Sequence, residues 1–244
     1  TKPCAEAVEA MALAMTENWG NPSALYNFGI DTAHSLRDAR HKVAAALGAE
    51  PDRVFFTSGG TEADNWAIFG TAKRYGKKNK HIITTAIEHH AVLNTCKYLE
   101  NEGFEVTYIG VDSDGIIKLE ELKKAIRTDT ILISIMTANN EIGTLQPVSD
   151  IGKIAKEYGI LFHTDAVQAF GHIPLNVDEM NIDMLSASAH KLHGPKGVGM
   201  LYIRNGVDIG SFVHGGAQER SKRAGTHNTA GIVGFGVAAK IAKE

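Results

Sequence analysis

Ser186-Ala-Ser-Ala-His-Lys-Leu-His-Gly-Pro-Lys-Gly-Val-Gly-Met200 places a lysine between two histidines, after a strand-like run and before a glycine-rich turn. This order predicts that Lys191 is displayed at the end of a strand. An amine in that place can condense with the aldehyde of pyridoxal phosphate (PLP) and hold it as a Schiff base. A single lysine is more often a solvated loop residue, so this interpretation depends on finding the rest of a cofactor site.

A carboxylate lies upstream of this lysine. In Gly159-Ile-Leu-Phe-His-Thr-Asp-Ala-Val-Gln-Ala-Phe-Gly171, an apolar run predicts a buried strand, and Asp165 follows its apolar end. An aspartate in such a place often caps a turn or a helix. Beside a PLP lysine it can instead keep the pyridine nitrogen protonated. Gln168, one turn later, can offer an amide donor to the phenolic oxygen of the same ring.

A phosphate site is predicted at Val54-Phe-Phe-Thr-Ser-Gly-Gly-Thr-Glu-Ala-Asp-Asn65, where a strand-like run passes through a Gly-Gly turn into a helix. Free N–H groups and the helix dipole favour an anion there, and we expect Gly60 and Thr61 to contribute to it. An ordinary hydroxyl N-cap without a ligand is the alternative. Ser188 and His190, two residues apart on the strand that leads to the lysine, point to the same side and can complete the phosphate shell.

Two further segments place polar side chains after predicted strands. Ile87-Glu-His-His-Ala-Val92 opens a helix, and His89 can lie flat on a planar ring and move protons at neutral pH. A role in capping or lining the helix fits His90 better than His89. In Thr137-Ala-Asn-Asn-Glu-Ile-Gly143, Asn140 can contact cofactor or substrate, although both asparagines are also typical turn formers.

Strand and helix patterns alternate along the chain, which predicts an α/β fold with a mostly parallel seven-stranded sheet covered by helices. The predicted strands are Val54–Thr57, His81–Thr85, Val106–Ile109, Ile131–Met136, Ile160–His163, Met184–Ser188 and Gly199–Ile203. The predicted helices are Pro3–Glu17, Asp31–Leu47, Thr61–Tyr75, His90–Asn101, Leu119–Ile126 and Val148–Tyr158. The candidate site residues follow the carboxyl ends of strands, where open α/β sheets bind ligands.

Composition and charge narrow the class of protein. The 244 residues, 43% hydrophobic and 22% charged, are typical of a globular protein with a large core. The net charge of −3 argues against nucleic acid as a main partner. The two cysteines are too far apart for a disulfide framework or a zinc site, and no metal site is expected. No apolar run approaches about 18 residues and no leader is visible, so we expect a cytoplasmic enzyme without a membrane segment.

Six blocks of sequence, in their order along the chain, resemble the NifS/IscS-type cysteine desulfurases, which are class-V aminotransferase-like PLP enzymes of fold-type I. The blocks are TSGGTEADN, IEHHAV, ANNEIG, HTDAVQ, SAHKLHGPKG and HGGAQERSKRAGTHN, and the resemblance covers nearly the whole chain. It implies the PLP-binding large domain of that fold. It also implies that Lys191 is the Schiff-base lysine, that Asp165 binds the pyridinium, and that His89 stacks on the ring and handles protons.

The resemblance assigns the remaining site residues as well. The phosphate would be held by Thr61, Ser188, His190 and, from a neighbouring subunit, Thr226. Gln168 and Asn140 would lie near the phenolic oxygen and the substrate. Because Thr226 would serve the site of a partner, the resemblance implies a homodimer.

The reaction implied by the resemblance converts L-cysteine to L-alanine. The freed amine of Lys191 would take the α-proton, and a cysteine thiolate of the enzyme would take the sulfur as a persulfide. The persulfide would pass to an acceptor, typically a scaffold protein for iron–sulfur cluster assembly, or serve thiolation.

The sequence departs from this family in two respects. The family's catalytic cysteine lies on a mobile loop of a small C-terminal domain, whereas Cys96 here falls on an apolar helix stripe and Cys4 opens the first helix. We therefore expect residues 1–244 to be the large domain, clipped at the N-terminus and lacking the C-terminal small domain. In addition, Ala24 and Tyr26 replace a Ser and a His of a family loop near the substrate.

Two other functions remain open from the sequence. A related fold-type I PLP enzyme, such as a selenocysteine lyase or a small-amino-acid aminotransferase, would keep Lys191, Asp165 and His89 without a persulfide-forming cysteine loop. A non-catalytic homologue acting as a dimer or scaffold partner would not need the Schiff-base lysine.

Overall fold

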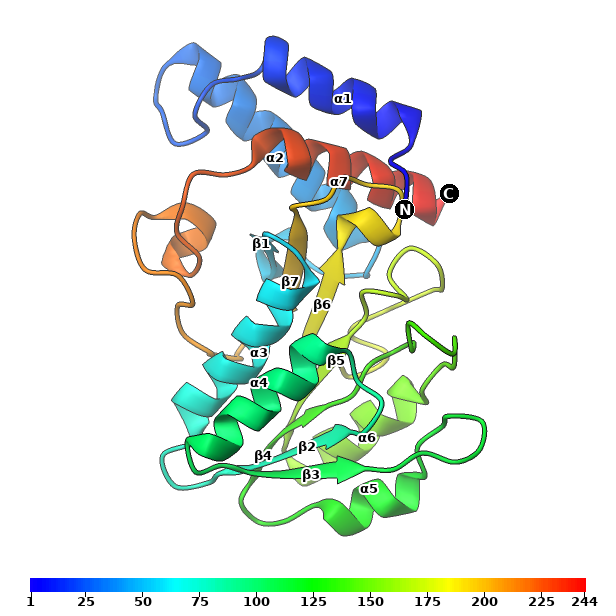
Figure 1. Ribbon diagram of the computed structural model, residues 1–244. Helices are drawn as coiled ribbons and strands as arrows, with labels where there is room; N and C mark the ends of the chain where they lie inside the picture. Colours follow the sequence, from blue (N-terminus) through cyan, green and yellow to red (C-terminus); the bar gives the residue numbers. More distant parts are fainter.

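A seven-stranded sheet forms the centre of the computed structural model, which describes residues 1–244 (Figure 1). The strand order is β1-β7-β6-β5-β4-β2-β3. The pairs β2–β3, β2–β4, β4–β5 and β5–β6 are parallel, whereas β7 is antiparallel to both β1 and β6. The strands are β1 (Val54–Thr57), β2 (His81–Thr85), β3 (Glu105–Ile109), β4 (Thr130–Ser134), β5 (Leu161–Asp165), β6 (Met184–Ser188) and β7 (Gly199–Ile203). The predicted mostly parallel sheet is confirmed.

The strand directions bring the carboxyl ends of six strands to one edge of the sheet. Because β7 is antiparallel to both of its neighbours, β1 runs in the same direction as β6 and the remaining parallel strands. The turns that follow β1, β2, β4, β5 and β6 therefore meet at this edge, which is where sheets of this kind bind ligands.

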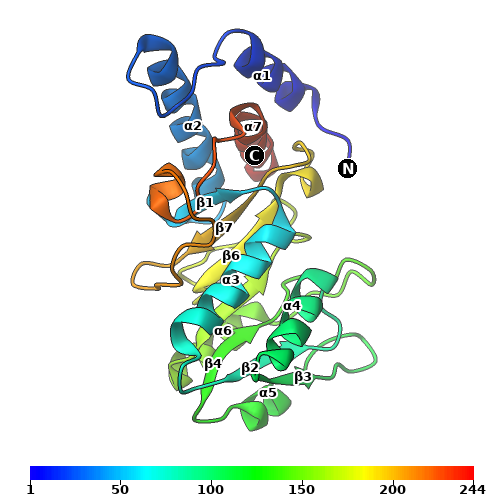
Figure 2. The same cartoon turned by 60° about the vertical axis from the view of Figure 1, so that its left-hand side comes forward.

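Helices cover both faces of the sheet (Figures 1 and 2). Helices α3 and α4 pack on one face, and α2, α6 and α7 contribute to the core on the other. Helix α1 packs against α7, which also contacts α2. The helices are α1 (Ala5–Thr16), α2 (Asn27–Ala45), α3 (Gly60–Tyr75), α4 (His90–Asn101), α5 (Leu119–Ala125), α6 (Val148–Tyr158) and α7 (Thr229–Lys243).

The two faces of the sheet carry separate hydrophobic cores. Neighbouring residues of a strand point to opposite faces, so Phe55 packs with Trp66 of α3 while Phe56 packs with Phe235 of α7. All residues of β2, β4, β6 and β7 are buried. The sheet is thus fixed from both sides, and the turns at its ends are held in place by rigid elements.

Helix α7 is the element that the sequence pattern does not predict. Three glycines, Gly231, Gly234 and Gly236, lower its intrinsic helix propensity. They also interrupt the apolar residues on its buried face, so the helical pattern is hard to recognise. The close packing of α7 explains one of them, because a Cβ on Gly236 would lie 2.6 Å from the Cα of Ala39 in α2. Asn228 caps the helix by accepting a hydrogen bond from the Gly231 N–H at 3.1 Å.

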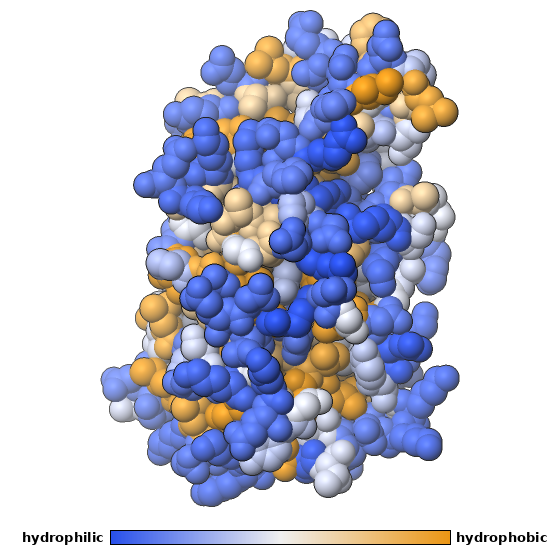
Figure 3. Space-filling view, turned by 180° about the vertical axis from the view of Figure 1, so that it is seen from behind, coloured by the Kyte–Doolittle hydropathy of each residue, from blue (hydrophilic) through white to orange (hydrophobic).

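The surface is mixed in character. Figure 3 shows the side opposite to that of Figure 1, with hydrophobic side chains reaching the surface at the end of the molecule formed by α1 and α2. Leu25 in the connection between these helices is 95% exposed. None of the helices combines the length and the apolar character that crossing a membrane requires.

Candidate functional site

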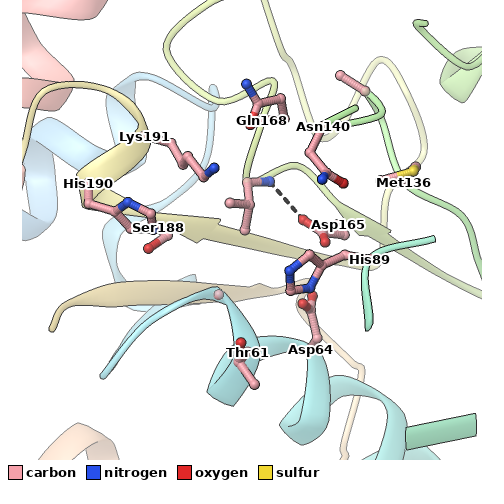
Figure 4. A pocket seen from close by; sticks show the side chains of 13 residues that line it. Thr61, Asp64, His89, Met136, Asn140, Asp165, Gln168, Ser188, His190 and Lys191 are labelled. Carbon is pink, nitrogen blue, oxygen red and sulfur yellow. Dashed lines mark hydrogen bonds between the residues drawn. The ribbon is translucent and has the colours of Figure 1, made fainter. Parts of the chain in front are cut away.

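A pocket of about 220 Å³ lies at the edge where the parallel strands end (Figure 4). Its walls come from the segments that follow β1, β2, β4, β5 and β6. The structure therefore brings together nearly all of the residues predicted for the site. Those that line the pocket are Gly60, Thr61, His89, Asn140, Asp165, Gln168, Ser188, His190 and Lys191.

Asp165 forms the buried acidic part of the pocket. It ends β5 and is 4% exposed, and its Oδ1 accepts a hydrogen bond from the Val167 N–H at 2.8 Å. Burial raises the pKa of the Asp165 carboxyl, and the Val167 N–H with nearby His89 and Lys191 offsets part of that rise. The carboxyl keeps its other oxygen free, which suits a positively charged ring nitrogen.

His89 has two roles. It precedes α4 as the N-cap residue, and its Nδ1 accepts a hydrogen bond from the Ala91 N–H at 3.1 Å. The capping role thus belongs to His89 and not, as the sequence favours, to His90. Because Nδ1 is the acceptor, the ring proton is assigned to Nε2. The cap also fixes the orientation of a ring that lines the pocket.

The opposite end of the pocket carries free hydrogen-bond donors. The N–H groups of Gly60 and Thr61, at the start of α3, make no hydrogen bond. Nor do the hydroxyls of Thr61 and Ser188, which line the same pocket. Gly60 fits closely, since a Cβ there would lie 2.5 Å from Cγ2 of Val167. Unpaired donors at a helix N-terminus form a site for an anion.

His190 lies beside these donors. Burial lowers the pKa of its imidazole, and the charge of Lys191 lowers it further. The ring is therefore neutral at pH 7, with one nitrogen able to donate a hydrogen bond to an anion.

Lys191 supplies a free amine. It ends the short 3₁₀ turn Ala189–Lys191 after β6, and its backbone carbonyl accepts a hydrogen bond from His172 Nε2 at 3.0 Å. Its Nζ makes neither an ion pair nor a hydrogen bond within the chain. Figure 4 shows the side chain extending toward the middle of the pocket.

The two asparagines after β4 have different roles. Asn139 is buried and forms the turn, because its amide donates to the Ile87 carbonyl and its Oδ1 accepts from the N–H groups of Glu141 and Ile142. Asn140 is exposed and lines the pocket. Gln168 also lines it, and its Oε1 is buried without a hydrogen-bond partner.

Asp64 also lines the pocket, although the sequence alone does not single it out. It lies on α3, is 1% exposed, and neither of its carboxyl oxygens makes a hydrogen bond. Donor or acceptor atoms of Asp64, His89 and Asp165 all lie within 4.8 Å of one another. A sequence signal exists in hindsight, because residues three apart share a helix face and Asp64 follows Thr61 by three positions.

Some predicted residues lie elsewhere. Thr226 is exposed and does not line the pocket of its own chain. Ala24 and Tyr26 lie in the connection between α1 and α2, also outside the pocket.

The two cysteines are both outside the pocket. Cys96 is fully buried on α4, and burial raises the pKa of its thiol to about 12, with a further contribution from Glu88. Cys4 precedes α1 at the N-cap position without a side-chain capping bond, its N–H donates to the His193 carbonyl, and it borders a different cavity. Burial keeps Cys96 in the thiol form, as its position on an apolar helix stripe predicts.

The sequence matches a known protein family and several known proteins. The aminotransferase class-V family model matches residues 1–244. Cysteine desulfurase IscS of Methanosarcina thermophila is 61% identical over 237 residues, which cover 97% of this chain and 59% of that protein. Cysteine desulfurase IscS of Clostridium botulinum is 58% identical over 244 residues, covering 100% and 61%. The chain thus spans about three fifths of the length of these two relatives.

Solved structures agree. A NifS-like protein superposes with a TM-score of 0.97 at 48% identity, covering 99% of this chain and 67% of that one. SspA in complex with cysteine gives a TM-score of 0.96 at 43% identity, covering 98% and 70%. The resemblance found in the six sequence blocks is confirmed, and because the family model matches every residue, the chain belongs to the class-V aminotransferase family.

Proposed function

We propose that this chain is the cofactor-binding domain of a PLP-dependent cysteine desulfurase, which converts L-cysteine to L-alanine and passes on the sulfur. The observation that carries the proposal is the position of one free amine, Lys191, in a pocket with an anion site at one end and the buried Asp165 at the other. Relatives at 61% and 58% identity are cysteine desulfurases.

The residues present fit PLP. A phosphate group matches the unpaired donors of Gly60, Thr61, Ser188 and His190. A protonated ring nitrogen matches the buried carboxyl of Asp165. The aldehyde carbon has the amine of Lys191 as its only lysine partner in the pocket.

When bound, PLP supplies a protonated ring that stabilises negative charge at the substrate Cα. The chain supplies the rest. Asp165 holds the proton on the ring nitrogen. The ring of His89 caps α4 through Nδ1, which leaves its Nε2 proton available in the pocket. The Lys191 amine has no competing partner within the chain. Once it is released from the cofactor, it takes the proton from the substrate Cα. Asn140 and Gln168 offer amides for orientation.

The nucleophile for sulfur comes from neither cysteine of these 244 residues. Sulfur transfer requires a thiolate at the substrate. Cys96 is buried as a thiol, and Cys4 borders another cavity. We propose that the thiol belongs to a part of the protein outside residues 1–244. The persulfide would be delivered to an acceptor such as an iron–sulfur scaffold protein.

A homodimer is part of the proposal. Thr226 is exposed and outside its own pocket, which leaves it free to contact the phosphate bound by a partner subunit. We also propose a cytoplasmic location.

The test is a titration of the PLP-loaded chain with L-cysteine, L-serine and L-alanine, followed by absorbance and by assay of alanine. We expect L-cysteine to change the absorbance of the bound cofactor, while alanine is released only when a protein with an accessible thiol is added. Alanine released by the chain alone would contradict the assignment of its cysteines. Transfer of the amino group to a keto acid would favour an aminotransferase instead.

A further inference from the structure

Beneath the pocket lies a carboxyl that none of the roles above uses. Asp64 is 1% exposed, lines the pocket from α3, and has no hydrogen-bond partner for either oxygen. An oxygen of its carboxyl lies within 4.8 Å of one of Asp165. Two ionised carboxylates at this separation, both away from water, would repel each other strongly.

No lysine or arginine forms an ion pair with Asp64, and two imidazoles lie near it, those of His163 and His89. The nearest basic group is His163 on β5, whose Nε2 lies 3.6 Å from Asp64 Oδ1. Burial lowers the pKa of this imidazole to about 3, so it is neutral. Its two nitrogens already bond to the hydroxyls of Ser134 at 2.8 Å and Ser186 at 2.9 Å.

His89 lies within 4.8 Å of both Asp64 and Asp165, and the acidic neighbours of Asp64 are Asp165 and Glu88. Glu88, in the β2–α4 connection, is 5% exposed and binds the Thr85 hydroxyl and the Met136 N–H. Burial raises the pKa of Asp64 well above its ordinary value, and the charge of Asp165 raises it further. Ser186 lowers it in part, and Glu88 adds to the rise.

The two pocket carboxyls therefore differ in their surroundings. Asp165 has the Val167 N–H and, on the side of the pocket, His89 and Lys191 to stabilise a negative charge. Asp64 shares the proximity of His89, but no N–H donates a hydrogen bond to either of its oxygens. We propose that Asp64 is a positioning residue that stays protonated, so that the pair carries one negative charge and this charge is held on Asp165, opposite the ring nitrogen of the cofactor.

The first test needs no cofactor, and it therefore separates this proposal from the proposed function on which it rests. The unfolding equilibrium constants of the wild type and of Asp64→Asn are measured in urea from about pH 5 to about pH 8. If Asp64 is protonated when folded and ionised when unfolded, unfolding releases its proton. The unfolding equilibrium constant of the wild type, divided by that of Asp64→Asn, then rises by up to about tenfold for each unit that the pH increases.

Asp165→Asn is the matched control, because it removes the other carboxyl of the pair. We expect the ratio of the wild-type unfolding constant to that of Asp165→Asn to rise less with pH, because in the folded chain Asp64 is the protonated carboxyl of the pair. A ratio for Asp64→Asn that is constant across this range, or a steeper rise for Asp165→Asn, would overturn the proposal.

The second test measures the affinity for PLP by titration at pH 7. Asparagine reproduces a neutral acid but not an anion, so Asp165→Asn is expected to weaken PLP at least about tenfold more than Asp64→Asn does. Equal weakening by both would show that Asp64 is also ionised and would contradict the proposal. Failure of the wild type to bind PLP would refute the proposed function, while the pH series would still decide the state of Asp64.

Discussion

Two buried carboxyls in this chain have opposite surroundings. Glu219 is 4% exposed and is surrounded by donors: Arg40 binds both of its oxygens at 2.6 and 2.7 Å, the Phe56 N–H binds at 2.9 Å, and His227 at 2.8 Å. Asp64 is 1% exposed and has no hydrogen bond at all. The first carboxyl is paired by the chain itself, and the second lines a pocket.

The pKa values of the two groups follow from this difference. Burial alone would raise the pKa of Glu219, but the hydrogen bonds from Arg40 and His227 outweigh it and lower the value to about 2. Burial and the charge of Asp165 raise the pKa of Asp64 well above its ordinary value, and the opposing effect of Ser186 does not outweigh them. A buried acid whose partners come from the chain stabilises the fold, whereas a buried acid without partners that lines a pocket is a candidate for a functional role.

Glu219 also secures an unusual backbone. Glu219, Arg220 and Ser221 have φ of 45°, 57° and 61°, three consecutive non-glycine residues in the left-handed region. Such conformations are costly and persist where surrounding contacts impose them. The ion pair to Arg40 on α2 supplies such contacts, and it anchors the segment that displays Thr226.

Removing Glu219 is therefore expected to be the most damaging change. Glu219→Ala leaves Arg40 buried and unpaired and should lower the free energy of unfolding by about 3–5 kcal/mol. Urea denaturation measures this loss. The control is Glu121→Ala, whose exposed pair with Lys124 should matter by no more than about 0.5 kcal/mol. A loss below about 1 kcal/mol for Glu219→Ala would show that the paired carboxyl does not anchor the segment.

Arg40→Lys keeps the charge but loses the two-point contact with Glu219. We expect a smaller loss of unfolding free energy, about 1–2 kcal/mol, because an ammonium cannot reproduce the planar fork of a guanidinium. A loss equal to that of Arg40→Ala would contradict this, since charge alone would then contribute nothing.

The pH dependence of stability should show both kinds of carboxyl. The pKa of Glu219 is depressed, so its contribution is present above its ordinary value of 4.5 and is lost as the pH falls toward about 2. The pKa of Glu88 is raised to about 8, chiefly by burial, so the folded state loses stability as the pH rises from 4.5 toward about 8. Each slope is at most about 1.4 kcal/mol per pH unit.

Urea denaturation across this range checks both slopes. Glu88→Gln should flatten the decline on the alkaline side and leave the acid side unchanged. A decline of the same steepness in Glu88→Gln would mean that Glu88 is ionised in the folded chain.

The two cysteines should differ in their reactivity toward a thiol reagent in the folded chain. Cys96 is buried as a thiol with a pKa of about 12, whereas Cys4 is partly accessible. In the native chain, iodoacetamide should modify Cys4 well before Cys96. Mass spectrometry of the peptides identifies the modified residue, and early labelling of Cys96 would contradict its burial.

Much of this structure is predictable from the sequence, for definite physical reasons. Short apolar runs bounded by turns predict the strands. Because ligands bind at the carboxyl ends of parallel strands, the sequence also predicts that residues as distant as Thr61 and Lys191 line one pocket, as they do. Helix α7 escaped prediction because its glycines, which permit close contact with α2, lower its propensity.

The parts that could not be predicted depend on long-range contacts. The burial of Asp64 against Asp165 depends on how α3 lies on β5, and the pairing of Glu219 with Arg40 joins residues at distant positions in the chain. The sequence favours His90 over His89 for capping, and only the backbone geometry at the start of α4 shows the reverse.

The most direct measurement is the covalent attachment of PLP to the purified chain. PLP is added, the adduct is fixed with borohydride, and the labelled peptide is identified by mass spectrometry for the wild type and for Lys191→Ala. A visible absorbance band and a label on Lys191, both absent in Lys191→Ala, are the predicted result. A label on other lysines that persists in Lys191→Ala, or no label at all, would contradict the assignment of this pocket as a PLP site.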